Sequence, residues 1–271
     1  MRIAILAEQR YLAQAQPRGM SAALKAEGHD VSLIDARAYE VAKGVGLDGF
    51  DLIVVRGRSW SVLTLLARAE SCGKPVLNSR LSIAAVHNKA DMAMALAYGE
   101  VRTPRTFIGR VADLAKYVPA ACYPLILKPT FGDNANGLQI VDTCRALRSL
   151  QWPEETALAQ QYLPNDGYDI KLYGIGDELW AVRKSSPLAG PRKAQTCAEL
   201  LPLTPEFKAL GRQCAQLFGL HLYGVDCIQT PEGPVVIEVN EFPNYTGVPD
   251  ADRALARYAI QYAQRCAKEP S

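Results

Sequence analysis

Over the first 80 residues, short apolar runs alternate with amphipathic stretches of helical period. The apolar runs, rich in β-branched and aliphatic residues, cover 2–6, 31–34, 51–55 and 75–77. The amphipathic stretches between them lie at 20–27 and 62–72. Strands that alternate with helices are typical of a parallel sheet covered by helices. This rhythm therefore predicts an α/β domain at the start of the chain.

A different rhythm begins near residue 120. Strand-like runs follow one another with short turns, and they lie at 125–130, 138–142, 157–163, 169–175 and 179–184. Connections this tight favour antiparallel pairing. The pattern ends with a helix at 205–218, two strands at 222–229 and 235–239, and a helix at 252–267. The second part of the chain is therefore expected to contain antiparallel sheets.

Two further segments, one helical in pattern and one without any pattern, complete the organisation of the chain. Residues 82–99 are predicted to form one helix, with Ser82 as its N-cap and Gly99 at its end. The segment 185–198 has no periodicity, which makes it a candidate mobile loop.

The composition excludes several classes of protein. The chain has 271 residues, of which 49% are hydrophobic, and its 30 basic and 28 acidic residues leave a net charge of +2. A chain this apolar buries a core, and this charge gives no sign of nucleic-acid binding. The apolar runs are far shorter than the roughly 18 residues of a membrane span, and the first residues lack the pattern of a signal sequence. We expect a cytoplasmic protein with no membrane or nucleic-acid partner.

Two carboxylates and an amide occur on neighbouring strand-like runs in the last third of the chain. Glu238 and Asn240 are two residues apart on one run, so their side chains point to the same face. Antiparallel pairing would bring Asp226, on the preceding run, beside them. Oxygens of this kind suit Mg²⁺, which also binds oxygens of substrate phosphates. The alternative is that all three are exposed polar positions on a half-buried hairpin.

A second candidate site lies upstream, where Lys128 closes the apolar run 125–127. A lysine at the end of a buried strand favours a bound anion. The segment 130–137, which follows almost at once, is rich in Gly and Asn, and its backbone N–H groups could fold over a phosphate. Together these two features indicate phosphate binding.

Two arginines follow the strand-like run 51–55. Arg56 and Arg58 lie at its carboxyl end, which is the edge where α/β sheets bind ligands. They could meet a carboxylate or a phosphate of a substrate, or they could belong to a solvated loop.

The order of these and further motifs resembles the ATP-grasp superfamily. The motifs are Asn88-Lys89, Thr103-Pro104, Pro124 to Pro129, Gln160 to Leu163, Asp169-Ile170-Lys171, Arg183, Gly224 to Asp226 and Ile237 to Asn240. Their spacing is most similar to that of the RimK-type carboxylate–amine ligases, over essentially the whole chain. The resemblance implies an ATP-grasp fold, of mixed α/β class, in three parts. These are an N-terminal parallel α/β domain at 1–85, a small lobe with its linker helix at 86–165, and a C-terminal lobe with the metal site at 166–271.

The resemblance also implies a nucleotide site. Lys89 and Lys128 would contact the phosphates of ATP, and Asp169 would lie near the ribose with Lys171 in the same motif. The backbone of Gln161, Tyr162 and Leu163 would bind the adenine.

The catalytic residues implied by the resemblance are Arg183 and Lys128. Arg183 would face the γ-phosphate and the acyl phosphate that forms from it. Asp226, Glu238 and Asn240 would hold two Mg²⁺ ions, for which Mn²⁺ could substitute.

The implied activity is the formation of an amide bond at the expense of ATP. A substrate carboxylate attacks the γ-phosphate, which gives an acyl phosphate and ADP, and an amine then displaces phosphate. Positioned cations are the groups that such a reaction requires. The partners would be a small-molecule carboxylate and amine, amino acids or a peptide among them, and a homo-oligomer is compatible with the sequence.

The sequence departs from the RimK-type pattern in two regions that would face the substrates, 184–188 and 241–245. The identity of the carboxylate and of the amine therefore stays open. One alternative is a small-molecule kinase, because parts of the chain also resemble inositol polyphosphate kinases of the same superfamily. Another is a nucleotide-binding regulatory protein without turnover, although the full set of implied site residues speaks against it.

Overall fold

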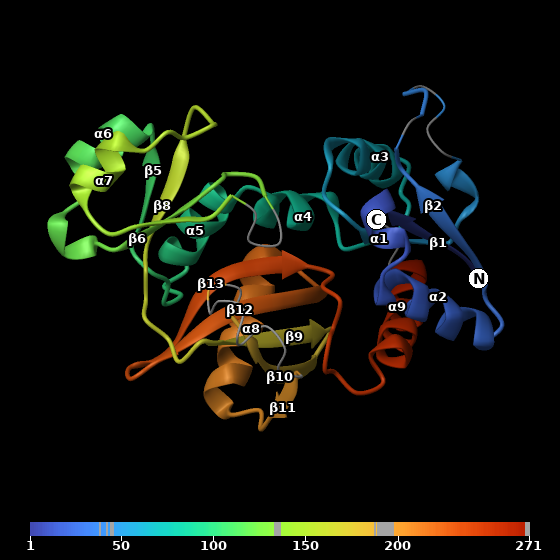
Figure 1. The fold of residues 1–271 in the computed structure, drawn as a ribbon. Helices are drawn as coiled ribbons and strands as arrows, with labels where there is room; N and C mark the ends of the chain where they lie inside the picture. Colours follow the sequence, from blue (N-terminus) through green and yellow to red (C-terminus); the bar gives the residue numbers. More distant parts are fainter. Residues whose placement is uncertain are drawn as a thin grey trace.

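The computed structural model describes residues 1–37, 39–41, 43, 46–132, 137–186, 188 and 198–268. It contains three sheets, which Figure 1 shows as three separate lobes around a common centre. The segments 130–137 and 185–198 are described mainly at their ends, so the expected phosphate-covering turn and mobile loop lie largely outside the described residues.

The first sheet is parallel, as the alternating rhythm predicts, and has the strand order β2-β1-β3-β4. Its strands are β1 (Arg2–Ala7), β2 (Asp30–Asp35), β3 (Leu52–Arg56) and β4 (Val76–Leu77). Alternate residues of β1 face opposite layers, so Ile3 and Ile5 pack with α2 (Ala15–Ala26), whereas Ala4 and Leu6 pack with α3 (Trp60–Ser71). Both faces are therefore covered, which explains why the central strands β1 and β3 are almost entirely apolar.

The second sheet is antiparallel and has the order β5-β8-β6-β7. Its strands are β5 (Thr106–Gly109), β6 (Leu125–Lys128), β7 (Gln139–Val141) and β8 (Ala157–Gln161). The short helices α6 (Val111–Tyr117) and α7 (Cys144–Ser149) cover one face and bury Leu125, Leu127 and Leu147. This small core fixes β6, which ends at Lys128.

The third sheet is also antiparallel, with the order β11-β10-β9-β12-β13. Its strands are β9 (Tyr168–Ile175), β10 (Glu178–Ser185), β11 (Glu199–Leu201), β12 (Leu222–Thr230) and β13 (Gly233–Glu241). Helix α8 (Pro205–Phe218) packs on one face. It begins at Thr204, whose hydroxyl accepts a hydrogen bond from the N–H of Phe207 at 3.2 Å, and it ends at Gly219 with φ of 62°. The other face is left for the pocket described below.

The linker differs from the single helix predicted over 82–99. It forms two helices, α4 (Arg80–His87) and α5 (Lys89–Tyr98), and the first begins after Ser79 rather than after Ser82. Asn88 interrupts the pattern because its backbone is extended and its side chain accepts a hydrogen bond from the N–H of Ala90 at 2.9 Å. A residue that caps a new helix cannot also continue the preceding one, and Lys89 therefore begins α5.

The last helix, α9 (Ala251–Lys268), returns to the first sheet. It packs against α2, and residues of both helices share a core with β1 and β3. Figure 1 shows α9 beside α2, at the opposite end of the chain. The short elements α1 (Gln9–Leu12), η1 (Leu47–Gly49) and η2 (Ala120–Cys122) complete the fold. Among the described residues, no helix combines the length and the apolar character that crossing a membrane requires.

Candidate functional site

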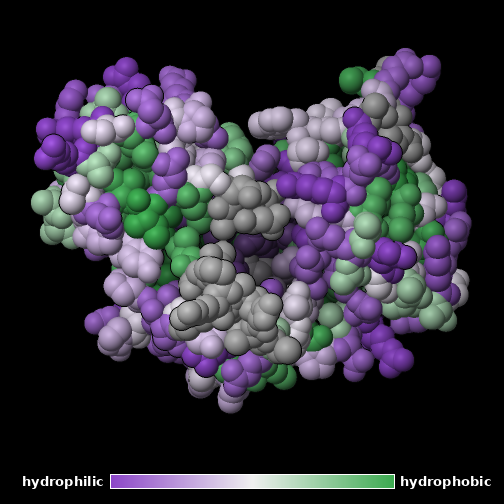
Figure 2. Space-filling model, in the orientation of Figure 1, coloured by the Kyte–Doolittle hydropathy of each residue, from purple (hydrophilic) through white to green (hydrophobic). Residues whose placement is uncertain are grey.

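A cavity of about 510 Å³ lies where the three sheets meet. Its walls come from the end of β3, from Lys89 on the linker, from β6 and β8, and from one face of the third sheet. Figure 2 shows the molecule hollowed at this place, with hydrophilic residues around the opening. The volume is typical of a small-molecule site.

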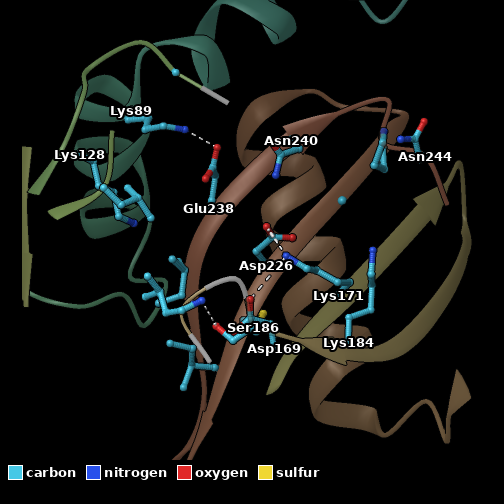
Figure 3. A pocket seen from close by; sticks show the side chains of 18 of the residues that line it. Lys89, Lys128, Asp169, Lys171, Lys184, Ser186, Asp226, Glu238, Asn240 and Asn244 are labelled. Carbon is cyan, nitrogen blue, oxygen red and sulfur yellow. Dashed lines mark hydrogen bonds and ion pairs between the residues drawn. The ribbon is translucent and has the colours of Figure 1, made fainter. Parts of the chain in front are cut away.

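The third sheet supplies a row of charged side chains. Asp226 on β12 lies opposite Glu238 on β13 and opposite Lys171 on β9, so all three side chains point to one face. The next pair, Gly224 and Asn240, adds an amide oxygen and an open space. Figure 3 shows these side chains projecting into the pocket. The sequence prediction of Asp226 beside Glu238 and Asn240 thus agrees with the register.

Lysines from two lobes neutralise these carboxylates. Lys171 Nζ lies 2.7 Å from Asp226 Oδ2, and 3.8 Å from Asp169 Oδ2. Lys89 reaches across from α5 and forms a hydrogen-bonded ion pair with Glu238 (Figure 3). Hydrogen bonds between charged groups are roughly twice as strong as those between neutral groups, and the Lys89–Glu238 pair joins the linker helix to the third sheet across the pocket.

Lys128 differs from the other two lysines. It is buried, and its Nζ donates a hydrogen bond to the neutral Oε1 of Gln160 at 2.6 Å. Burial lowers the pKa of Lys128 to about 8, although the nearby Glu238 carboxylate partly opposes this. A buried cation whose hydrogen-bond acceptor is neutral can bind an anion without first breaking a strong ion pair.

Burial and neighbouring charges shift the pKa values of the remaining pocket groups in opposite directions. Burial raises the pKa of Asp169. Burial also opposes ionisation of Glu238, but the ammonium groups of Lys89 and Lys128 outweigh it and hold the pKa of that carboxyl below its usual value. Burial would lower the pKa of Lys171, but Asp226 and Asp169 raise it. Glu238 and Lys171 therefore stay charged near neutral pH.

The donor set fits a hard cation that shares oxygens with a phosphate. Asp226 and Glu238 offer carboxylate oxygens and Asn240 offers an amide oxygen, all on one face of the hairpin. Among the described residues, no cluster of three or more His, Cys, Asp and Glu side chains could hold a metal by itself. A metal ion here would need further oxygens from a bound substrate, as Mg²⁺ does in phosphate sites.

Arg183 does not line the pocket, although the resemblance implies a catalytic role for it. Its guanidinium lies 2.6 Å from Asp166 Oδ2 and packs 3.8 Å from the centre of the Tyr168 ring. Lys184, the next residue of β10, lines the pocket and lies opposite Asp169 in the register. Neighbours in a strand point to opposite faces, so only one of the two can reach the site. With the register between β9 and β10 known, the same alternation selects Lys184, which shares a face with Asp169 and Lys171.

The segment 161–163, at the end of β8, contacts the pocket through alternate residues. Gln161 and Leu163 line it, whereas Tyr162 does not. The N–H of Tyr162 donates to the carbonyl oxygen of Pro124 at 2.9 Å, which anchors the segment to the loop before β6.

Two residues of the first domain that no motif predicted also line the pocket. Tyr11 and Gln14 follow β1 and line the wall beside Arg56 and Arg58. No local motif marks Tyr11 or Gln14, because only the packing of the first sheet against the third brings them to the site.

The chain matches one family model and is similar to several known proteins. The model of the RimK-like ATP-grasp domain matches residues 86–261. A probable alpha-L-glutamate ligase of Methanococcoides burtonii is 28% identical over 99% of this chain and 97% of its own length. The crystal structure of a RimK domain ATP-grasp protein from Sphaerobacter thermophilus has a TM-score of 0.73 at 22% identity, and covers 96% of this chain and 100% of that one. D-alanine–D-alanine ligase from Bacillus anthracis has a TM-score of 0.75 at 17% identity, with 100% of both chains covered.

Proposed function

The chain belongs to the RimK-like ATP-grasp family and is an ATP-dependent carboxylate–amine ligase that releases ADP, and we propose that L-glutamate is one of its substrates. The proposal of L-glutamate rests on the relative from Methanococcoides burtonii, which is named as a glutamate ligase and matches nearly the whole chain. The second substrate would be an amino acid or a peptide. The kinase alternative has no support from the comparisons.

One observation carries the chemistry that we assign to the pocket. Lys89 and Lys128, from the linker and the second sheet, face Asp226 and Glu238 of the third sheet across one cavity. Cations on one side and hard oxygen ligands on the other suit a triphosphate with its metal ion. The phosphate oxygens of such a ligand would meet the lysines, and its metal ion would meet the carboxylates.

In this proposal each side of the pocket binds a different part of ATP. Gln161, Tyr162 and Leu163 bind the adenine, and Asp169 lies near the ribose. Lys89 and Lys128 bind the phosphates, and Lys171 and Lys184 approach the γ-phosphate, with Lys184 in place of Arg183. Asp226, Glu238 and Asn240 would hold two Mg²⁺ ions, which would neutralise phosphate charge and polarise the γ-phosphoryl group.

The reaction then has two steps. An oxygen of the substrate carboxylate attacks the γ-phosphorus, a new C–O–P linkage forms, and the bond to ADP breaks. The amine nitrogen next attacks the acyl carbon, the C–O bond to phosphate breaks, and the nitrogen loses a proton as the amide forms. Lys128 and Lys184 would stabilise the charge that develops on the phosphoryl oxygens, and the walls of the pocket would position the two reactants.

The proposed function is tested by identifying the products of the reaction. Wild-type protein with ATP, Mg²⁺ and L-glutamate should release ADP and form species heavier by one glutamyl residue, detected by mass spectrometry. When hydroxylamine replaces the amine, a hydroxamate should form, because an acyl phosphate reacts with it. ADP release without hydroxamate or amide product, over a panel of amino acids and short peptides, would refute this function.

A further inference from the structure

Arg56 is a buried cation on the pocket wall with only neutral hydrogen-bond acceptors. It is 7% exposed, and its guanidinium donates a hydrogen bond to the carbonyl oxygen of Phe242. Its Nη2 lies 3.4 Å from Gln14 Oε1 and 3.4 Å from Asn244 Oδ1, which is long for a hydrogen bond. Among the described residues no carboxylate forms an ion pair with Arg56, and none accepts a hydrogen bond from its buried Nε.

This arrangement is costly unless an anion compensates it. A buried charge without an ion pair of its own destabilises the fold, and burial lowers the pKa of Arg56, although the nearby Tyr11 and Glu241 partly oppose this. The neighbouring Arg58 differs, because Glu241 Oε2 lies 3.4 Å from its Nη1. Lys89 and Lys171 also differ from Arg56, since Lys89 forms an ion pair with Glu238 and Lys171 forms one with Asp226. The positive charge of Arg56 is thus available to a ligand.

The topology of the first sheet places Arg56 where such sheets bind ligands. In the order β2-β1-β3-β4 the chain leaves β1 toward β2 on one side, and β3 lies on the other. The carboxyl ends of β1 and β3 therefore flank a topological switch point, which is the usual ligand crevice of α/β sheets. Arg56 ends β3, and Tyr11 and Gln14 follow β1. The centre of the Tyr11 ring lies 4.1 Å from the guanidinium carbon, so Tyr11 packs against Arg56 beside this crevice.

The position relative to the metal-binding row favours a substrate over a nucleotide. Phe242, whose carbonyl oxygen accepts a hydrogen bond from Arg56, lies just beyond the end of β13 and two residues after Asn240. Asn244, which lies near Arg56, is on the side of the pocket away from Lys128 in Figure 3. A ligand held by Arg56 would thus reach toward the reacting phosphate from the end opposite Lys128.

We propose that Arg56, assisted by the side-chain amides of Gln14 and Asn244, binds a carboxylate of the amino-acid substrate that does not react. This inference rests on the proposed function, because it names the subsite for one substrate of that reaction. The two contacts of Nη2, with Gln14 and Asn244, are both long, so this nitrogen can donate a charge-assisted hydrogen bond to a carboxylate in the pocket. Arg56 thereby selects substrates with a second anionic group.

The experiment measures binding of small ligands to protein saturated with a non-hydrolysable ATP analogue and Mg²⁺. Titration calorimetry compares L-glutamate with its α-amide and with L-glutamine, in wild type and in Arg56→Met, Arg56→Lys and Arg10→Met. Arg10 is the matched control, since it lies 4.6 Å from the same Tyr11 ring but pairs with Glu8 at 2.7 Å.

We expect Arg56→Met to weaken L-glutamate binding about 10- to 100-fold, with the affinity for the ATP analogue unchanged. Arg56→Lys should lose less, and Arg10→Met should bind like wild type. One of the two amides should bind weakly to wild type and lose little in Arg56→Met, which identifies the carboxylate that Arg56 holds. The melting temperature of Arg56→Met should equal or exceed that of wild type, because an uncompensated charge has been removed.

Three outcomes would overturn the inference: unchanged L-glutamate affinity in Arg56→Met, an equal loss for the acid and both amides, or a wild type that binds none of the three. Product formation by the wild type is measured separately. Amide products together with any of these outcomes would leave the ligase function intact and reject only the carboxylate subsite.

Discussion

If Lys128 binds a phosphate of ATP, as we propose, its pKa should make ATP binding depend on pH. Burial lowers this pKa to about 8, and Nζ donates only to the neutral Gln160. If the phosphates bind the ammonium form, the apparent dissociation constant equals the intrinsic one divided by the protonated fraction. That fraction is about 0.9 at pH 7 and about 0.1 at pH 9, so ATP should bind roughly tenfold more weakly at pH 9. Phosphate groups have their second pKa near 6, so ATP itself stays ionised over this range.

The assay is titration of a non-hydrolysable ATP analogue in the presence of Mg²⁺ between pH 7 and 9.5. The affinity should be greatest below pH 8 and fall as Lys128 loses its proton. Lys128→Arg keeps its charge at every pH, so its curve should be flat, whereas Lys128→Met should bind weakly throughout. A flat curve for the wild type, or an equal slope in Lys128→Arg, would refute the reasoning.

Three further predictions concern other parts of the site and the fold. Glu238→Gln should lower kcat more than 100-fold with an unchanged circular-dichroism spectrum, and near-normal turnover would reject the metal assignment. Lys184→Met should lower kcat/KM for ATP at least tenfold and Arg183→Met far less, and the reverse order would restore Arg183 to the site. Asn78→Ala should cost about 3–5 kcal/mol in urea unfolding, because the buried side chain of Asn78 makes three hydrogen bonds, two of them with Leu222; a loss below about 1 kcal/mol would contradict this.

The periodicity of the sequence was sufficient to predict much of the fold. The parallel first sheet follows from the alternation of strands and helices, and the pairs β9–β10 and β12–β13 follow from their tight turns, whereas the pairs β5–β8 and β6–β8 join strands far apart in the chain. The resemblance to the ATP-grasp fold is confirmed by the family model and the solved structures. The prediction of a single helix for the linker was wrong. Residues 82–99 have an uninterrupted helical pattern, but Asn88 gains more from capping α5 than from continuing α4. Such a choice depends on local hydrogen bonds that periodicity does not report.

Some residues of the candidate site could likewise be predicted from local rules, and others could not. Asp226, Glu238 and Asn240 could be placed together because strand alternation and hairpin pairing are local rules. The same rule, applied through the register with Asp169, would have favoured Lys184 over Arg183. The alternation was present in the sequence, but the register between β9 and β10 had first to be known.

The sequence by itself predicted most of the strands and helices, their order, and the residue types that could bind a phosphate and a metal ion. Only the tertiary structure decided which elements meet. Tyr11 and Gln14 reach Arg56, and α9 reaches α2, through contacts between segments far apart in the chain. Burial then decides the charge states, since the pKa of Lys128 falls while that of Lys171 rises. Both effects depend on the distance between side chains in space, which local sequence patterns do not contain.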